Sequence, residues 1–137
     1  MKVMLDTNVV LDHLLDRKPF AQFSAAIFSE IEKGAIRGVI GATTVTTIHY
    51  LVSKALGQTS AINTVKLLLR LFEAAPINHL VLSGALEIAS KDFEDAVLIE
   101  AGLHVGVTAI ITRDRHGFSH SPISVFSPNE FLRTLKG

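Results

Sequence analysis

The sequence predicts an α/β protein: a three-layer α/β/α sandwich built on a mainly parallel sheet of four to five strands. Short apolar runs typical of buried strands alternate with longer segments whose apolar residues recur at helical spacing. Such alternation implies right-handed crossovers and helices on both faces of the sheet. The 137 residues are 48% hydrophobic and 19% charged, which is enough material for one substantial core, so we expect a single domain over residues 1–137.

Short apolar runs mark the expected strands. They cover residues 2–5, 35–40, 77–82, 108–112 and 123–126. Pro76 breaks a helical pattern just ahead of the third run, which favours a new strand there. The first and fourth runs each end beside an acid, Asp6 and Asp114. Because ligands of parallel sheets bind beyond the carboxyl ends of the strands, these two acids point to a functional site.

Apolar residues at intervals of three and four mark the expected helices. They cover residues 8–15, 20–31, 43–56, 61–74, 83–89, 93–103 and 128–135. Pro19 lies just ahead of the second expected helix, at a position where proline is tolerated. Gly34 and Gly57 are the expected stops of the second and third helices, and Ser60 is the expected N-cap of the fourth.

Composition restricts the classes of function. There is no Cys, which excludes disulfides, thiolate zinc sites and a cysteine nucleophile. No apolar run approaches the roughly 20 residues that span a bilayer, and no signal-peptide pattern is present, so we expect a soluble, cytoplasmic protein without a membrane partner. Thirteen basic and thirteen acidic residues give no net charge, so any contact with nucleic acid should be confined to a local site.

Acids from distant segments suit metal-assisted hydrolysis. Asp6, Asp95 and Asp114 would meet at one edge of the sheet, and clustered carboxylates repel one another unless a cation holds them. A hard divalent cation prefers such oxygen ligands. It can activate a water molecule and stabilise the leaving oxygen of a phosphodiester.

Each acid also has a simpler structural interpretation. Asp6 is placed to cap the helix that follows it, and Asp92 to cap the helix that carries Asp95. Asp92 and Asp95 are three positions apart and share a helix face, whereas Glu94 is expected to face elsewhere. Asp114 has an arginine on either side and fits an ordinary loop acid.

Three motifs in order resemble the PIN-domain nuclease family. Residues 3–12, with Asp6-Thr7-Asn8 after an apolar strand, resemble the family's opening motif. Residues 92–97 resemble its central acidic motif at a helix start, and residues 110–114 resemble its last strand and acid. The resemblance covers essentially the whole chain and implies a PIN-like fold.

The resemblance implies a metal-dependent ribonuclease that hydrolyses RNA phosphodiester bonds. Asp6, Asp95 and Asp114 would bind Mg²⁺ or Mn²⁺, Asn8 would orient the first acid by a hydrogen bond, and Asp92 would be a further acid of the catalytic group. Small prokaryotic members are commonly VapC-like toxins that a cognate antitoxin holds inactive, and they often form homodimers. Both partners are carried over from the family.

Thr47 is the departure from the family pattern. Many PIN domains carry an acid, usually Glu, at the position on the third helix that aligns with Thr47. A hydroxyl cannot replace the charge of a carboxylate, so a second metal would be held more weakly unless Asp92 substitutes. His49 lies two positions along the helix and therefore faces away.

Basic residues around the last acid are candidate RNA contacts. Arg113, Arg115 and His116 could grip the RNA backbone. An arginine paired with a nearby acid, or a solvated loop histidine, is the simpler interpretation, and His120 is a loop residue of the same kind.

Three other functions share part of this sequence pattern. A phosphatase of the haloacid-dehalogenase type needs a second acid two residues after Asp6, where this chain has Asn8, and a phosphoreceiver domain needs paired acids and a late lysine. The stronger alternative is a PIN domain whose activity is weakened or lost through Thr47, and which binds RNA or a protein partner.

Overall fold

The computed structural model describes residues 1–136 and contains one five-stranded sheet in which every pairing is parallel. The strands are β1 (Lys2–Leu5), β2 (Arg37–Gly41), β3 (Phe72–Ala75), β4 (Ala109–Ile111) and β5 (Ser124–Phe126). Their order across the sheet is β3-β2-β1-β4-β5. The predicted α/β class and parallel sheet are therefore confirmed.

Strand β1 is central, and the chain winds outwards from it in both directions. It pairs with β2 on one side and with β4 on the other, with Leu5 opposite Ile111. The direction of winding reverses between β1 and β4, which makes the carboxyl ends of these two strands the topological switch point where such sheets bind ligands. Asp6 lies there, and its backbone N–H donates to the Ile111 carbonyl at 2.9 Å.

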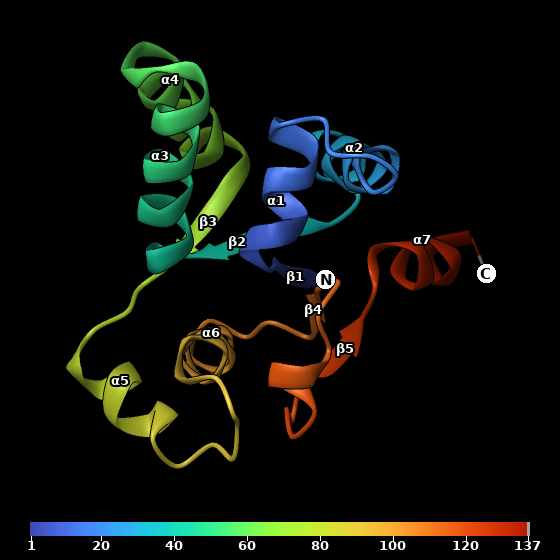
Figure 1. The fold of residues 1–137 in the computed structure, drawn as a ribbon. Coiled ribbons are helices and arrows are strands. Elements are labelled where there is room, and N and C mark those ends of the chain that lie inside the picture. The colour runs from blue at the N-terminus through green and yellow to red at the C-terminus, as the bar shows by residue number, and fades with distance from the viewer. Residues whose placement is uncertain (137) are drawn as a thin grey trace.

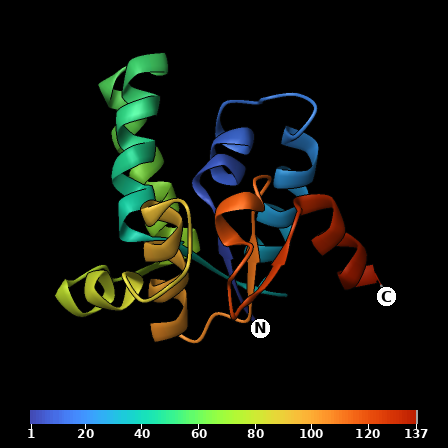
Figure 2. The same cartoon turned by 60° about the horizontal axis from the view of Figure 1, so that its bottom comes forward.

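Helices cover both faces of the sheet (Figure 1). One layer contains α1 (Thr7–Leu14), α2 (Ala21–Glu32), α3 (Ala42–Leu56), α4 (Gln58–Leu71) and α7 (Pro128–Lys136). The opposite layer contains α5 (His79–Ala85) and α6 (Phe93–His104), with the short 3-10 helix η1 (His116–Phe118) packed against α6. Figure 2 shows α3 and α4 as a long hairpin beside the sheet.

Alternation along each strand separates two cores. Val3 and Leu5 of β1 belong to the core under α1, α2 and α3, whereas Met4 belongs to the core under α6. Both faces are buried because parallel sheets are covered on both sides. This explains why the strands appear in the sequence as continuous apolar runs.

The third strand is the main correction to the sequence analysis. It covers Phe72–Ala75 and not residues 77–82, which contain the start of α5 instead. The apolar run 77–82 was misleading because only one helical face of it is buried: Val81 is 1% exposed, while Leu80 is 65% exposed. Asn78 caps α5 by accepting a hydrogen bond from the Val81 N–H at 3.0 Å.

Both ends of helix α4 also differ from the ends that the sequence predicted. Helix α4 ends at Leu71, before the expected end at residue 74, because the chain extends into β3. It also begins at Gln58, so Ser60 is inside the helix and is not its N-cap. Gly57 ends α3 as predicted, with a φ of 93° that favours glycine. Within residues 1–136, no helix combines the length and the apolar character that crossing a membrane requires.

Candidate active site

Asp6 is the buried acid of the site. It follows β1, caps α1 and is only 8% exposed. Its Oδ1 accepts from the Thr7 N–H at 2.8 Å, and its Oδ2 accepts from the Thr112 hydroxyl at 2.7 Å and from Asn8 Nδ2 at 3.4 Å. An ionised carboxylate offers about four acceptor positions. Asp6 therefore caps its helix, as the simpler interpretation expected, and retains acceptor capacity for a ligand.

Asn8 lies where the resemblance expected it, close to Asp6. The contact of its Nδ2 with Asp6 is long, at 3.4 Å. Its Oδ1 is buried without a hydrogen-bond partner among the described residues. A buried amide oxygen usually has a partner, because leaving it unsatisfied costs free energy.

Thr112 connects the first acid to the last. Its hydroxyl donates to Asp6, lies 3.2 Å from the Asp114 carbonyl and accepts from the Asp114 N–H at 3.0 Å. The Asp114 carboxylate is exposed and accepts from the His116 N–H at 3.0 Å. The turn after β4 thus presents Asp114 at the same edge as Asp6.

Helix α6 supplies the remaining acids. Asp92 is its N-cap and accepts from the Glu94 and Asp95 N–H groups at 2.9 and 3.4 Å. Asp95 is partly buried against η1, where a Cβ at Gly117 would overlap its carboxylate. The Ser90 hydroxyl donates to the Gly117 carbonyl at 2.7 Å and so joins the start of α6 to η1.

The carboxylates act on one another electrostatically. Burial, followed by the negative charges of Asp6, Asp92, Asp114 and Glu94 in that order, raises the pKa of Asp95 to about 7. Burial also raises the pKa of Asp6, against the opposing hydrogen bonds from Thr112 and Thr7. The site is therefore a group of acids that holds more negative charge than its surroundings stabilise.

The acids are near one another without forming a closed ligand shell. In residues 1–136, no three His, Cys, Asp or Glu side chains are already arranged to hold a metal ion. The donors are nevertheless those that a hard divalent cation prefers, since the group consists of carboxylate oxygens. Burial and neighbouring negative charges raise the pKa of two of these acids, Asp6 and Asp95. The negative charges of Asp6, Asp92, Asp114 and Glu94 all act on the carboxyl group of Asp95, so these side chains lie within electrostatic reach of it.

The third helix contributes hydroxyls where an acid was expected. The hydroxyl of buried Thr44 lies 3.0 Å from the hydroxyl of partly buried Thr7 and connects α3 to the start of α1. Thr47 is one helical turn further along the same face and is partly buried. Thr43 Oγ1 is buried without a hydrogen-bond partner among the described residues. This side of the site is neutral.

Arg113 is held in a buried ion pair. Its Nε lies 2.6 Å from Oδ2 of Asp12, which is fully buried, and its guanidinium lies 3.9 Å from the ring centroid of Phe20. Arg17 pairs with the same carboxylate at 2.9 Å and donates to the Asn8 carbonyl at 3.1 Å. One carboxylate thus serves two arginines, next to the turn that carries the last acid.

The other two candidate RNA contacts lie on the same turn. Arg115 pairs with Glu130 of α7. His116 begins η1 and is exposed, with its backbone bonded to Asp114. His49 lies two positions beyond Thr47 on α3 and is partly buried.

Sequence reasoning missed three residues of this region. Thr112 was assigned only to a strand end, Asp12 was only part of the opening motif, and Glu94 was expected to face away although its charge raises the pKa of both Asp6 and Asp95. A hydroxyl directly after the fourth strand, at the level of Asp6, was a usable signal for Thr112.

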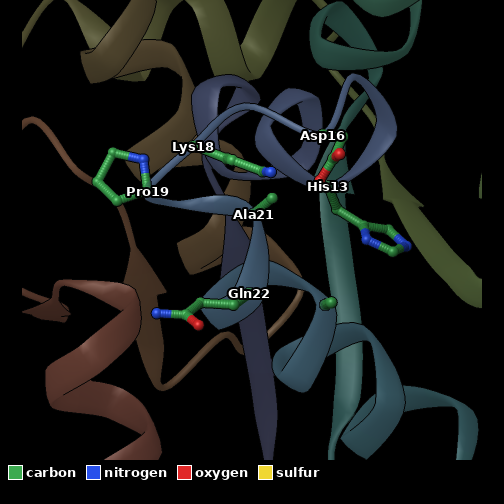
Figure 3. A pocket seen from close by; sticks show the side chains of 7 residues that line it. His13, Asp16, Lys18, Pro19, Ala21 and Gln22 are labelled. Carbon is green, nitrogen blue, oxygen red and sulfur yellow. The ribbon is translucent and has the colours of Figure 1, made fainter.

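A separate hollow lies at the connection between α1 and α2 (Figure 3). It has a volume of about 600 Å³ and is lined by His13, Asp16, Lys18, Pro19, Ala21, Gln22 and Ala25. Burial lowers the pKa of His13, whose ring lies 4.3 Å from that of Phe28. This lining is distinct from the acids at the strand ends.

Known proteins of the same fold are found among solved structures. The chain superposes on VapBC-1 from nontypeable Haemophilus influenzae with a TM-score of 0.71 and 16% identity, covering 94% of this chain and 99% of that one. A toxin–antitoxin complex from Klebsiella pneumoniae superposes with a TM-score of 0.68 and 17% identity, covering 92% of this chain and 97% of that one. Mycobacterium tuberculosis VapC20, a toxin that cleaves the sarcin–ricin loop, superposes with a TM-score of 0.68 and 10% identity, covering 85% of this chain and 93% of that one.

The sequence itself identifies the family. No curated protein matches the chain. The family profile described as "PIN domain" matches residues 2–116, which include all three acidic motifs of the sequence analysis. The predicted resemblance is confirmed, and this chain belongs to the PIN-domain family.

Proposed function

We propose that this protein is a Mg²⁺- or Mn²⁺-dependent endoribonuclease whose metal is held by Asp6, Asp95 and Asp114. The observation that carries the proposal is the position of these acids at the switch point between β1 and β4, where burial, and then repulsion by the neighbouring carboxylates, raises the pKa of Asp95 to about 7. A divalent cation would relieve that repulsion. When bound, it would activate a water molecule and stabilise the leaving oxygen of the phosphodiester.

Other groups of the protein hold these acids in position. The Thr112 hydroxyl and the Thr7 N–H fix the orientation of the Asp6 carboxylate, and the Thr112 hydroxyl also accepts from the Asp114 N–H. Asp92 keeps the start of α6 intact by capping it. Gly117 leaves the space that the Asp95 carboxylate occupies. Neutral Thr47 adds no charge on the α3 side, which favours one strongly held metal over two.

Family and fold support the wider proposal of a toxin from a toxin–antitoxin pair. The Klebsiella pneumoniae structure is a toxin–antitoxin complex, and VapC20 is a toxin that cleaves the sarcin–ricin loop. By this analogy the chain would act on cytoplasmic RNA, form a homodimer and be inhibited by a cognate antitoxin.

Cleavage of RNA tests the proposal directly. Structured and unstructured RNAs are incubated with wild type, Asp6→Asn and Asp95→Asn in Mg²⁺, Mn²⁺ or EDTA. Asp16→Asn is the matched control, because Asp16 is an exposed loop acid outside the group. We expect metal-dependent cleavage by wild type and the control only. Full activity of either site variant would refute the assignment, and absence of both cleavage and Mn²⁺ binding in wild type would favour a non-catalytic binding module.

A further inference from the structure

A second hollow lies where Arg113 meets the starts of α2 and α7. It has a volume of about 340 Å³ and is lined by Phe20, Phe23, Arg113, Ser127, Pro128 and Asn129. This volume is at the low end of the roughly 300–1,000 Å³ of small-ligand pockets. The lining brings together the start of α2, the turn after β4 and the start of α7. Arg113 immediately precedes Asp114, so the lining shares the turn after β4 with the last acid.

The walls of the hollow are aromatic. Phe20 and Phe23 are both partly exposed, although α2 buries its other apolar face in the core through Ile27 and Ile31. Pro128 adds a buried apolar surface. Exposed phenyl rings gathered in a concave place are suited to a flat apolar ligand, because stacking removes their faces from water.

The polar groups at the rim differ in whether they already have partners within the protein. Ser127 is engaged in the cap of α7, where its N–H donates to Glu130 Oε1 at 2.9 Å and its Oγ accepts from the Glu130 N–H at 3.2 Å. Asn129 is exposed and offers both an amide donor and an acceptor. Arg113 lies over the Phe20 ring and keeps 29% of its side chain exposed.

The charge beside the hollow is positive. Arg113 and Arg17 share the single carboxylate of Asp12, so these three side chains carry a net charge of +1. The Arg17 side chain is 40% exposed, which leaves part of this charge accessible to solvent. An anionic ligand is therefore favoured over a neutral one.

We propose that this hollow binds an unpaired nucleobase of the RNA, with the phosphate of that nucleotide facing Arg113 and Arg17. The inference rests on the proposed function and adds to it a place on the protein that would hold one base of the RNA. Protein readers of unpaired bases combine aromatic stacking, an arginine plane and amide hydrogen bonds. A peptide side chain would use the apolar wall but not the positive charge.

Binding in EDTA tests the site without cleavage. The affinity of a fluorescently labelled, unstructured six-nucleotide RNA is measured by anisotropy, beside the same backbone without bases. Phe23→Leu removes the ring and keeps apolar volume, and Phe20→Leu is the second variant. Tyr50→Leu is the matched control, because Tyr50 is a 58% exposed aromatic residue on α3. Circular dichroism verifies the fold of each variant.

We expect Phe23→Leu to weaken binding of the intact RNA about ten-fold and to leave binding of the base-free backbone unchanged. Tyr50→Leu should bind both as wild type does. Equal affinity of wild type for the two probes, or no effect of either Phe variant, would overturn the base site.

Cleavage by wild type in Mg²⁺, measured in parallel, separates this proposal from the preceding one. Cleavage together with base-independent binding overturns only the base site. Base-dependent binding without cleavage overturns the nuclease and leaves the base site standing.

Discussion

Replacement of Asp95 by Asn should stabilise the metal-free protein at neutral and alkaline pH. Burial, followed by the charges of Asp6, Asp92, Asp114 and Glu94, raises the pKa of Asp95 from 3.8 to about 7. Asn has nearly the same shape and no charge to repel those neighbours. The variant thus removes an unfavourable charge from the folded state. It also removes a proposed metal ligand, so stability is gained while activity is lost.

The magnitude and its pH window follow from this pKa. The rise from 3.8 to about 7 is about 3, and each pKa unit corresponds to about 1.4 kcal/mol. That product, about 4 kcal/mol, is an upper bound because Asp95 is partly exposed and screened by solvent, so we expect about 2 kcal/mol. Below pH 3.8 both states are protonated and this stability is fully present. It is lost as the pH rises through about 7, because the folded state holds the proton that the unfolded state releases.

Thermal unfolding in EDTA between pH 4 and 9 measures the effect. Wild type should lose stability between pH 4 and 7, and Asp95→Asn should lose less, because only Asp6 then contributes a raised pKa. At pH 8 the variant should melt roughly 6–10 °C above wild type, at about 3–5 °C per kcal/mol for a domain of this size. Asp16→Asn should follow the wild-type profile. A variant with the full wild-type slope, or one that is less stable at pH 8, would refute the electrostatic argument.

Three other substitutions should distinguish residues that stabilise the fold around the site from residues that affect metal binding. Asp12→Asn should lower the free energy of unfolding by about 3 kcal/mol in urea titrations, because it leaves two arginines without their buried charged partner. Thr112→Val should lower it by about 1.5–3 kcal/mol at pH 8, since it removes the hydroxyl that donates to ionised Asp6. Gly117→Ala should weaken Mn²⁺ binding in calorimetry at least ten-fold, because the new methyl group displaces the Asp95 carboxylate.

Each of these has a clear contrary result. A change below 1 kcal/mol in Asp12→Asn, similar to that of exposed Asp16→Asn, would mean that the ion pairs contribute nothing net. Unchanged stability of Thr112→Val would mean that its hydrogen bond is not formed in solution. Wild-type Mn²⁺ affinity in Gly117→Ala would mean that Asp95 is not a ligand.

The sequence predicted the elements that have a strong local signal. The start of α6 was located because Asp92 is both an N-cap and part of an acidic pattern, and the end of α3 because Gly57 has the positive φ that glycine favours. The third strand was misplaced because an apolar run has the same composition whether it is a buried strand or an amphipathic helix. Only the pairing of Phe72–Ala75 with β2 distinguishes the two.

The site was predictable in its acids and not in its supporting contacts. Asp6 and Asp114 stand at strand ends, which places them at one edge once the sheet is parallel. The hydrogen bond between Thr112 and Asp6, 106 residues apart, depends on the register of β1 against β4. The pairing of Asp12 with Arg113 spans 101 residues and depends on helix packing. Neither distance is encoded in local spacing.

The most direct test of the central claim is the position of Mn²⁺ in crystals of the protein, located by its anomalous scattering. The account predicts a peak at the carboxyl ends of β1 and β4, about 2 Å from oxygens of Asp6, Asp95 and Asp114, which disappears in Asp95→Asn. A peak elsewhere on the protein, or one that Asp95→Asn leaves unchanged, would contradict the assignment of these acids as the metal centre.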